Sequence, residues 1–185
     1  MELDPLLLSR IQFAFVVSFH AIFPVFTIGL ASFIAVLEGL AFKTGDGVWA
    51  KLSAFWTTVF AVVFGMGVVS GIVMSFQFGT NWSNFAQASA NFLGPVLSYE
   101  VITAFFLEAA FLGILLFGRD KVPAGVHLLA AVMVATGTFI SSFWTLTANS
   151  WMHTLAGYEV REGVFHITSG IEAIFNPSFP YRFLH

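Results

Sequence analysis

The sequence predicts an all-α fold: a polytopic bundle of transmembrane helices with four spans and a tail that leads to a fifth. Two observations carry this prediction. The 185 residues are 58% hydrophobic and 9% charged, whereas an average soluble domain is about 45–50% apolar and about 25% charged. Four segments also hold the roughly 20 mainly apolar residues that a helix needs to cross a bilayer. A soluble globule of this length could not bury so much apolar surface, so an ordinary soluble domain and a disordered chain are excluded.

Short polar connectors separate the predicted spans. Residues 43–47 form a turn with two glycines, residues 79–84 are polar, and residues 118–121 are charged. The tail is mixed in character, and the two prolines within residues 176–180 break any helix there. The whole chain, residues 1–185, is predicted to be the N-terminal part of one bundle. The four spans and the outer tail are expected at residues 11–42, 52–76, 95–117, 122–148 and 149–185.

Lysine and arginine in short loops orient the predicted spans, because such loops are retained in the cytoplasm. The loops after the first and third spans hold four of these cations, whereas the opposite side has Arg10 and none in residues 77–95. The two basic loops are therefore expected in the cytoplasm. The N-terminus, the loop of residues 77–94 and the tail are expected to face outward. The four loop cations are Lys43, Lys51, Arg119 and Lys121.

The composition also excludes several kinds of site. A formal net charge of −3 with seven Lys and Arg residues provides no basic surface for nucleic acid. The chain has no cysteine, which excludes a disulfide scaffold, cysteine-ligated zinc and iron–sulfur clusters. Any metal chemistry must therefore use histidine, methionine or carboxylate ligands.

Three ionisable residues lie deep in the predicted spans, where a charge costs roughly 3 kcal/mol or more and usually faces a cavity, a partner or a cofactor. At about 1.5 Å of rise per residue, His20 lies roughly 13 Å and Glu100 roughly 8 Å from the outer edge, and Glu108 lies roughly 12 Å deeper than Glu100. His20 is either a core histidine that donates to a carbonyl or a ligand of a metal or heme. Glu100 and Glu108 share a broad helix face and form either a structural pair with hydroxyls such as that of Thr103 or a proton relay.

The other titratable residues are interpreted as structural or solvated. Glu38 lies near the cytoplasmic end of the first span, and its side chain is expected to reach the interface. His127, His153 and His166 lie at span ends or in the tail and are expected to be solvated. The second span contains three glycines, Gly65, Gly67 and Gly71. Their spacing lets another helix or a flat cofactor approach the backbone closely.

Five motifs follow one another along the chain. They include Gln-Phe-Gly-Thr-Asn-Trp-Ser at residues 77–83 and Ala-Asn-Ser-Trp-Met at residues 148–152. Together the motifs resemble subunit I of the cytochrome bd-type quinol oxidases, and the resemblance covers essentially all 185 residues in order. The other motifs are residues 9–20, 99–108 and 176–177, and residues 63–71 and 176–182 are most similar to the cyanide-insensitive branch.

The resemblance implies that the chain binds heme. His20 would be the axial ligand of one of two high-spin hemes, either heme d or a b heme in its place, and Glu100 would lie beside this heme pair. His185 would be an axial ligand of the low-spin b heme, which takes electrons from quinol. Arg10 would pair with a heme propionate, and residues 77–82 would close the outer side of the heme region.

The resemblance also implies an activity, that of a quinol:oxygen oxidoreductase of the respiratory chain in the bacterial cytoplasmic (inner) membrane. Ubiquinol or menaquinol would be oxidised on the outer, periplasmic side. Oxygen would be reduced to water with cytoplasmic protons, which generates a proton-motive force. Glu108 and Ser141 would belong to the path of these protons. A second membrane subunit, and a small single-span subunit with it, would complete the oxidase in the lipid bilayer.

The family's subunit is longer than this chain, so the 185 residues are expected to be its N-terminal part, without oxidase turnover alone. Two other functional classes stay open. A proton-coupled transporter or channel would use Glu100 and Glu108 as substrate-coupled carboxylates and hold no heme, although no internal repeat of the kind common in transporters is found. A non-catalytic assembly module would only pack against the partner subunit.

Overall fold

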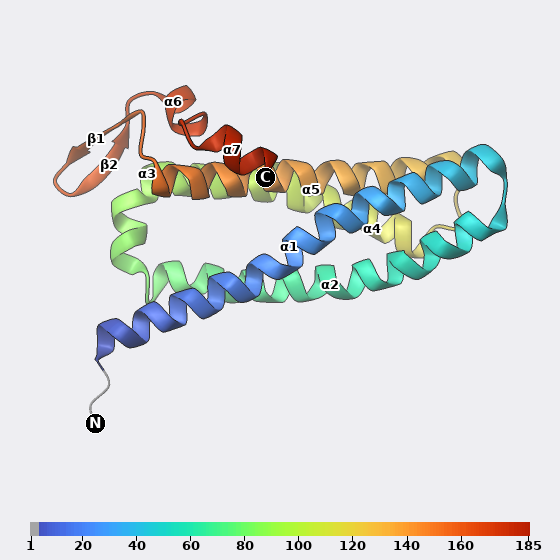
Figure 1. The fold of residues 1–185 in the computed structure, drawn as a ribbon, viewed down its shortest axis with the longest axis horizontal. Helices are drawn as coiled ribbons and strands as arrows, with labels where there is room; N and C mark the ends of the chain where they lie inside the picture. The colour runs from blue at the N-terminus through green and yellow to red at the C-terminus, as the bar shows by residue number, and fades with distance from the viewer. Residues whose placement is uncertain (1–3) are drawn as a thin grey trace. The chain divides into compact units, whose positions relative to one another are not determined.

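Four long helices dominate the structure, a computed structural model that describes residues 4–185 (Figure 1). Within these residues, four helices are long and apolar enough to cross a membrane, and the third is interrupted by a π-helical turn. The predicted all-α class with four membrane spans is therefore confirmed. The elements are α1 (Pro5–Thr44), α2 (Gly47–Gly79), α3 (Ser83–Glu100), the π-helix η1 (Val101–Phe105), α4 (Phe106–Phe117), α5 (Ala124–His153), β1 (Tyr158–Arg161), β2 (Val164–Ile167), α6 (Gly170–Ile174) and α7 (Phe179–Leu184).

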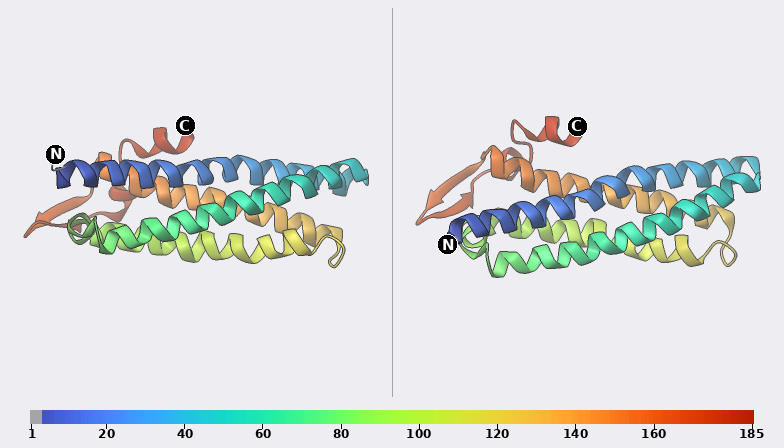
Figure 2. Two further views of the ribbon diagram at one scale, coloured as in Figure 1. Left: turned by 90° about the horizontal axis from the view of Figure 1, so that it is seen from below. Right: turned by 60° about the horizontal axis from the view of Figure 1, so that its bottom comes forward.

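Helices α1 and α2 form a hairpin (Figures 1 and 2), and capping interactions define its ends. Asp4 accepts a hydrogen bond from the backbone N–H of Leu6 at 3.0 Å, which satisfies one of the free donors at the start of α1. Gly45 ends α1 with a φ of 69°, a left-handed conformation that glycine adopts without a steric penalty. Asp46 then caps α2 by accepting from Val48 N–H at 2.9 Å. These caps make both helices a few residues longer at each end than the predicted spans.

The chain divides into two compact units, and the first holds the residues up to Ser83 together with Phe111–Ala135. Its core is formed by apolar side chains from α1, α2, α4 and α5, all at most 8% exposed. At about 25 cal/mol per Å² of buried apolar surface, such a cluster stabilises the unit chiefly through area removed from solvent and through close packing. Representative members are Ile34, Phe60, Leu115, Ala130 and Val134.

The second unit holds Asn84–Ala110 and Thr136–His185, and its tail is folded rather than extended. The strands β1 and β2 pair in antiparallel register and lie beyond the end of α5 (Figure 2). Trp151 of α5 is 1% exposed and packs on Phe92 with ring centroids 4.5 Å apart. Asn176 donates to the Ser150 hydroxyl at 2.9 Å, so the segment that breaks the helix is held on α5. The predicted break at residues 176–180 lies between α6 and α7.

One boundary prediction is wrong. Residues 77–94 are expected to form a loop, but α2 continues to Gly79 and α3 begins at Ser83. The first turns of α3 are too polar to be recognised as a span by hydropathy. One face of this segment is nevertheless apolar and buried, with Phe92 and Leu93 each 4% exposed. An amphipathic helix therefore replaces most of the predicted loop.

Candidate functional site

His20 lies on α1 and is held by a residue of α2. Its Nδ1 atom is 2.9 Å from the hydroxyl oxygen of Ser70. That hydroxyl donates its single hydrogen to the carbonyl of Gly67 at 3.0 Å, so Ser70 can only accept from the ring. Nδ1 of His20 therefore carries the proton, and the lone pair of the neutral imidazole is on Nε2. Nε2 has no hydrogen-bond partner in residues 4–185.

Two glycines of α2 leave room for this arrangement. A Cβ atom at Gly71 would lie 3.1 Å from Cε1 of His20, and one at Gly67 would lie 3.3 Å from Cβ of Phe23. Both distances are shorter than ordinary van der Waals contacts. The small-residue spacing predicted to allow close approach therefore lets the His20 imidazole pack against the α2 backbone at Gly71.

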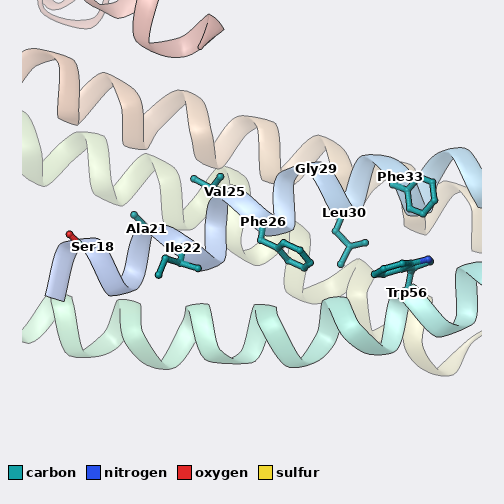
Figure 3. Close-up of a pocket in the computed structure, with 9 residues that line it drawn as sticks. All are labelled: Ser18, Ala21, Ile22, Val25, Phe26, Gly29, Leu30, Phe33 and Trp56. Atoms are coloured by element: carbon teal, nitrogen blue, oxygen red, sulfur yellow. The ribbon is translucent and has the colours of Figure 1, made fainter. Parts of the chain in front are cut away.

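The surface of α1 beside His20 is apolar. A groove there is lined by eight residues of α1 from Ser18 to Phe33 and by Trp56 of α2 (Figure 3). It contains no titratable side chain, and Ile22 and Val25 on it are 62% and 72% exposed. This composition suits contact with lipid, and the titratable side chains of α1 are His20 and residues toward its two ends.

Glu100 ends α3 and is bound by α5. The hydroxyl of Ser141 donates to Oε1 of Glu100 at 2.7 Å. Nearby, Trp144 donates from its indole N–H to the Thr103 hydroxyl at 3.0 Å and stacks on Tyr99 with centroids 5.4 Å apart. The two predicted residues Glu100 and Ser141 are thus in direct contact, whereas the hydroxyl of Thr103 is used by Trp144.

Glu108 is buried, with 6% of its surface exposed, and its Oε1 atom has no hydrogen-bond partner among the described residues. A Cβ atom at Gly137 would overlap Cγ of Glu108, so only glycine leaves space for this side chain on α5. A buried carboxyl oxygen without a partner is rare and indicates a bound water, a proton or a missing group. Glu108 therefore has the burial and the unused hydrogen-bonding capacity expected of a functional carboxyl group.

The π-helical turn η1 brings Glu100 and Glu108 closer to the same face of the helix. In a regular α-helix eight residues turn through about 800°, so Glu108 would lie roughly 80° around the axis from Glu100. A π turn bonds residue i to i+5 and takes up about one extra residue. Glu100 and Glu108 consequently come close to two whole turns apart, on a narrower face than the sequence predicts.

Glu38 and His127 are not where the sequence predicts them. Glu38 is 5% exposed and His127 is 3% exposed, so neither side chain reaches the interface or solvent. Arg119 donates to Oε1 of Glu38 at 2.5 Å, and Nδ1 of His127 is 3.0 Å from Oε2. Both expectations are wrong because Arg119, in the turn after α4, and His127 of α5 contact Glu38 at the end of α1. These residues are far apart in the sequence, so the sequence does not predict the contacts.

At the other end of the hairpin, amide side chains join α1 to the segment after α2. Gln12 donates to Gln77 at 2.7 Å and accepts from the indole N–H of Trp82 at 3.3 Å. The Phe13 ring contacts Trp82 with centroids 4.9 Å apart. Arg10, one turn before, is exposed and makes no hydrogen bond or ion pair with residues 4–185. Its guanidinium is thus available to an acidic group outside the described chain.

His185 follows the last helix, α7, which is held on α5. Arg182 donates to the side chain of Asn149 at 2.8 Å, and Phe179 packs on Phe143 with centroids 5.3 Å apart. His185 itself is exposed, and its ring has no hydrogen-bond partner in the described part of the chain. Asn149 and Arg182, whose positioning role the sequence alone does not reveal, set the place of this histidine.

Comparison with known proteins decides the family. The family model for cytochrome bd terminal oxidase subunit I matches residues 8–185. The chain belongs to this family. It is 37% identical over 183 residues to cytochrome bd ubiquinol oxidase subunit 1 of Bacillus subtilis, covering 99% of this chain and 39% of that protein. It is 36% identical over 184 residues to cytochrome bd-II ubiquinol oxidase subunit 1 of Escherichia coli, covering 98% of this chain and 36% of that protein.

Among solved structures, the bd oxidase from Geobacillus thermodenitrificans matches with a TM-score of 0.90 and 31% sequence identity, over 97% of this chain and 42% of that chain. The chain thus spans less than half the length of these bd oxidase relatives. The resemblance noted in the sequence is confirmed, and so is the transmembrane helical fold of the cytochrome bd family.

The cytochrome bd family implies heme, and the residues present fit it. Heme iron binds an imidazole nitrogen, and Nε2 of His20 is free for this role among the described residues while Gly71 lets the ring pack on the α2 backbone. Residues 4–185 contain no group of three or more His, Cys, Asp or Glu residues that could hold a metal ion. The single unpaired imidazole nitrogen of His20 fits the role of a heme ligand.

Proposed function

We propose that this chain is the heme-bearing part of a terminal quinol oxidase that reduces oxygen to water. The relatives from Bacillus subtilis and Escherichia coli that match almost the whole chain are named ubiquinol oxidase subunits, and a third, from Bacillus subtilis, is a putative menaquinol oxidase subunit. The observation that carries the proposal is His20, whose proton is held on Nδ1 by Ser70 so that Nε2 can bind iron.

The proposed ligands are His20 for a high-spin heme, d or b, and His185 for the low-spin b heme. When bound, the hemes carry electrons from ubiquinol or menaquinol to oxygen. Arg10 would pair with a heme propionate, because its guanidinium is exposed and unpaired within the described residues. Glu100 would lie beside the high-spin hemes, with its carboxyl group oriented by Ser141. Residues 77–82, held by the contacts of Gln12, would close the outer side of this region.

Glu108 and Ser141 are proposed to deliver protons, together with Glu100. Ser141 donates to Glu100, and Glu108 has an unused buried oxygen on the same helix face. Titratable groups that follow one another within the apolar part of a membrane protein can relay protons through the bilayer. Protons consumed from the cytoplasm and released outside by quinol oxidation would generate a proton-motive force.

We further propose that the whole chain acts as one functional domain within a larger oxidase. Its partners are a second membrane subunit and a small single-span subunit, and its place is the bacterial inner membrane. A heme-free transporter and a non-catalytic assembly module are less well supported, because neither needs the oriented His20.

The function is tested in membranes that contain the chain in its assembled complex. We expect heme absorption that changes on reduction, and oxygen consumption that depends on ubiquinol or menaquinol. A purified complex without any heme absorption would overturn the oxidase proposal and favour the transporter. A complex that binds heme but consumes no oxygen with either quinol would favour the assembly module.

Removing the Ser70 hydroxyl is expected to weaken heme binding at His20. In Ser70→Ala the Nδ1 proton loses its acceptor, and loss of such a partner typically costs about 10–100-fold in metal affinity. We expect a lowered high-spin heme content and a changed iron–histidine stretching frequency in resonance Raman spectra. Ser70→Thr keeps the hydroxyl and serves as the matched control. Identical spectra for Ser70→Ala and the unmodified protein would contradict the role of Ser70.

The proposed orientation can be tested by cysteine labelling, since the chain has no cysteine of its own. Val160→Cys in β1 lies on the proposed outer side and is 55% exposed, whereas Lys121→Cys lies in the exposed basic turn before α5. A membrane-impermeant maleimide added to intact spheroplasts should label the cysteine at position 160 and not that at position 121. After permeabilisation both should react. The reverse pattern in intact spheroplasts would invert the proposed topology.

A further inference from the structure

A buried charged cluster lies at the end of the first unit that carries the basic turn, and its α1 member Glu38 is about 27 Å along the helix axis from His20. It takes one residue from each of four segments. Glu38 comes from α1, Ser53 from α2, Arg119 from the turn after α4, and His127 from α5. The side chains of Glu38 and His127 are 6% and 3% exposed, and that of Arg119 is 29% exposed. The proposed function assigns no role to this cluster.

His127 faces an oxygen acceptor at each ring nitrogen. Its Nε2 atom is 3.0 Å from the backbone carbonyl of Leu115, and its Nδ1 atom is 3.0 Å from Oε2 of Glu38. A carbonyl can only accept, so Nε2 must carry a proton. Leu115 is in the last turn of α4, where carbonyls lack helical partners, and His127 satisfies this one. The contact between Nδ1 and Oε2 must then hold a second proton, bonded to either the imidazole or the carboxyl group.

The hydrogen bonds at the other carboxyl oxygen decide which group holds this proton. Oε1 of Glu38 accepts from the Ser53 hydroxyl and from Arg119, whose nitrogen is 2.5 Å away. Arg119 also donates to the Ser53 hydroxyl at 3.2 Å. Charge-assisted donors of this kind stabilise the carboxylate form. The second proton therefore lies on the imidazole, and His127 is a buried imidazolium paired with the Glu38 carboxylate.

A second observation extends the cluster along α2. Thr57 lies one helical turn from Ser53, about 6 Å along the axis, and is 3% exposed. Its hydroxyl has no hydrogen-bond partner in residues 4–185. A buried hydroxyl without a protein partner indicates an ordered water. A water at Thr57 continues the row of hydrogen-bonding groups from the carboxylate toward the interior of the bundle.

We propose that Glu38 and His127 form a proton-binding site. The site takes up a proton from the side of the basic turn and stores it next to the hydroxyl groups of Ser53 and Thr57 on α2. Arg119, the partly exposed member, separates the carboxylate from solvent, and its displacement admits water to Oε1. The groups that face the pair are Ser53 of α2, Arg119 of the turn and the Leu115 carbonyl of α4. The assignment of the stored proton to oxygen reduction rests on the proposed function, whereas the charge state of His127 does not.

The charge state is tested by nitrogen-15 NMR of the assembled complex, labelled at histidine and reconstituted in lipid. His127→Gln assigns the signal by its loss. We expect both ring nitrogens of His127 to be protonated at neutral pH. In Glu38→Gln the imidazole loses its counterion and should carry a single ring proton. Ser53→Ala keeps the ion pair and serves as the matched control. A singly protonated His127 in the unmodified protein, with Nδ1 free of hydrogen, would overturn the proposal.

The link to oxygen reduction is tested by the rate of proton uptake after a pulse of oxygen, followed with a pH dye. We expect Glu38→Gln and the double variant Glu38→Gln/His127→Gln to slow uptake about tenfold, equivalent to ~1.4 kcal/mol of barrier, with unchanged heme spectra. The double variant removes both charges of the pair, so it separates proton storage from the cost of an unpaired buried charge. Unchanged uptake in an active oxidase would overturn the storage role. An inactive unmodified complex with a doubly protonated His127 would overturn the oxidase proposal instead.

Discussion

His20→Ala is expected to abolish the absorption of one high-spin heme in membranes that contain the assembled complex. Alanine removes the only nitrogen that α1 offers to the iron at this depth, and the remaining groups near it are the Ser70 hydroxyl and the backbone at Gly71. Neither is a usual axial ligand of heme. The measurement is the reduced-minus-oxidised spectrum together with the heme content per complex.

The matched control for His20→Ala is His153→Ala. His153 ends α5 and is exposed, so its removal should leave the spectrum unchanged. A His20→Ala complex with unchanged high-spin spectra would eliminate His20 as a ligand. Loss of the whole complex from the membrane is a different result, and quantifying the assembled subunits distinguishes it from loss of heme.

Glu108→Gln is expected to lower the rate of oxygen reduction by about 100-fold or more, which is the usual contribution of a positioned acid or base. Glutamine keeps the size of the side chain in the space left by Gly137, but it cannot bind or release a proton. Heme content should therefore stay unchanged while turnover falls. Steady-state oxygen consumption, normalised to heme, is the measurement.

A second variant separates the acid function of Glu108 from its position. Gly137→Ala keeps the carboxyl group but places a methyl group against Cγ of Glu108, so we expect a smaller loss of rate with the same heme content. Glu172→Gln in the exposed first turn of α6 is the control for losing a carboxylate elsewhere. Full activity in Glu108→Gln would show that protons bypass this residue.

The four spans could be predicted because lipid leaves few options for the backbone. Every buried N–H and C=O must be paired within the segment, so a long apolar run becomes a helix whatever its neighbours are. The start of α3 was not predicted to be helical, because residues 83–94 are amphipathic rather than continuously apolar. They gain their stability from one buried face that includes Phe92 and Leu93. The π turn η1 could not be predicted either, since no local sequence signal marks it.

The depth of each residue along its span identified His20, Glu100 and Glu108 as candidates. The same criterion wrongly predicted that the Glu38 side chain reaches the membrane interface. Burial of a charge depends on its partners, and the two ionisable partners of Glu38, Arg119 and His127, lie 81 and 89 residues away. A residue near a helix end can reach solvent or be covered by a turn. Sequence position alone does not distinguish these outcomes.

The sequence by itself determined the membrane class, the number of spans, the family and the candidate histidines and carboxylates, because these follow from composition, periodicity and local motifs. Only the tertiary structure decided which hydrogen-bond partners and how much space each candidate side chain has. Ser70, 50 residues from His20, sets which ring nitrogen carries the proton. Gly137 makes room for Glu108, and Glu38 and the Leu115 carbonyl face the two ring nitrogens of His127. Hydrogen bonds and steric fit act over a few ångströms in space, so these properties arise only where the fold brings distant residues together.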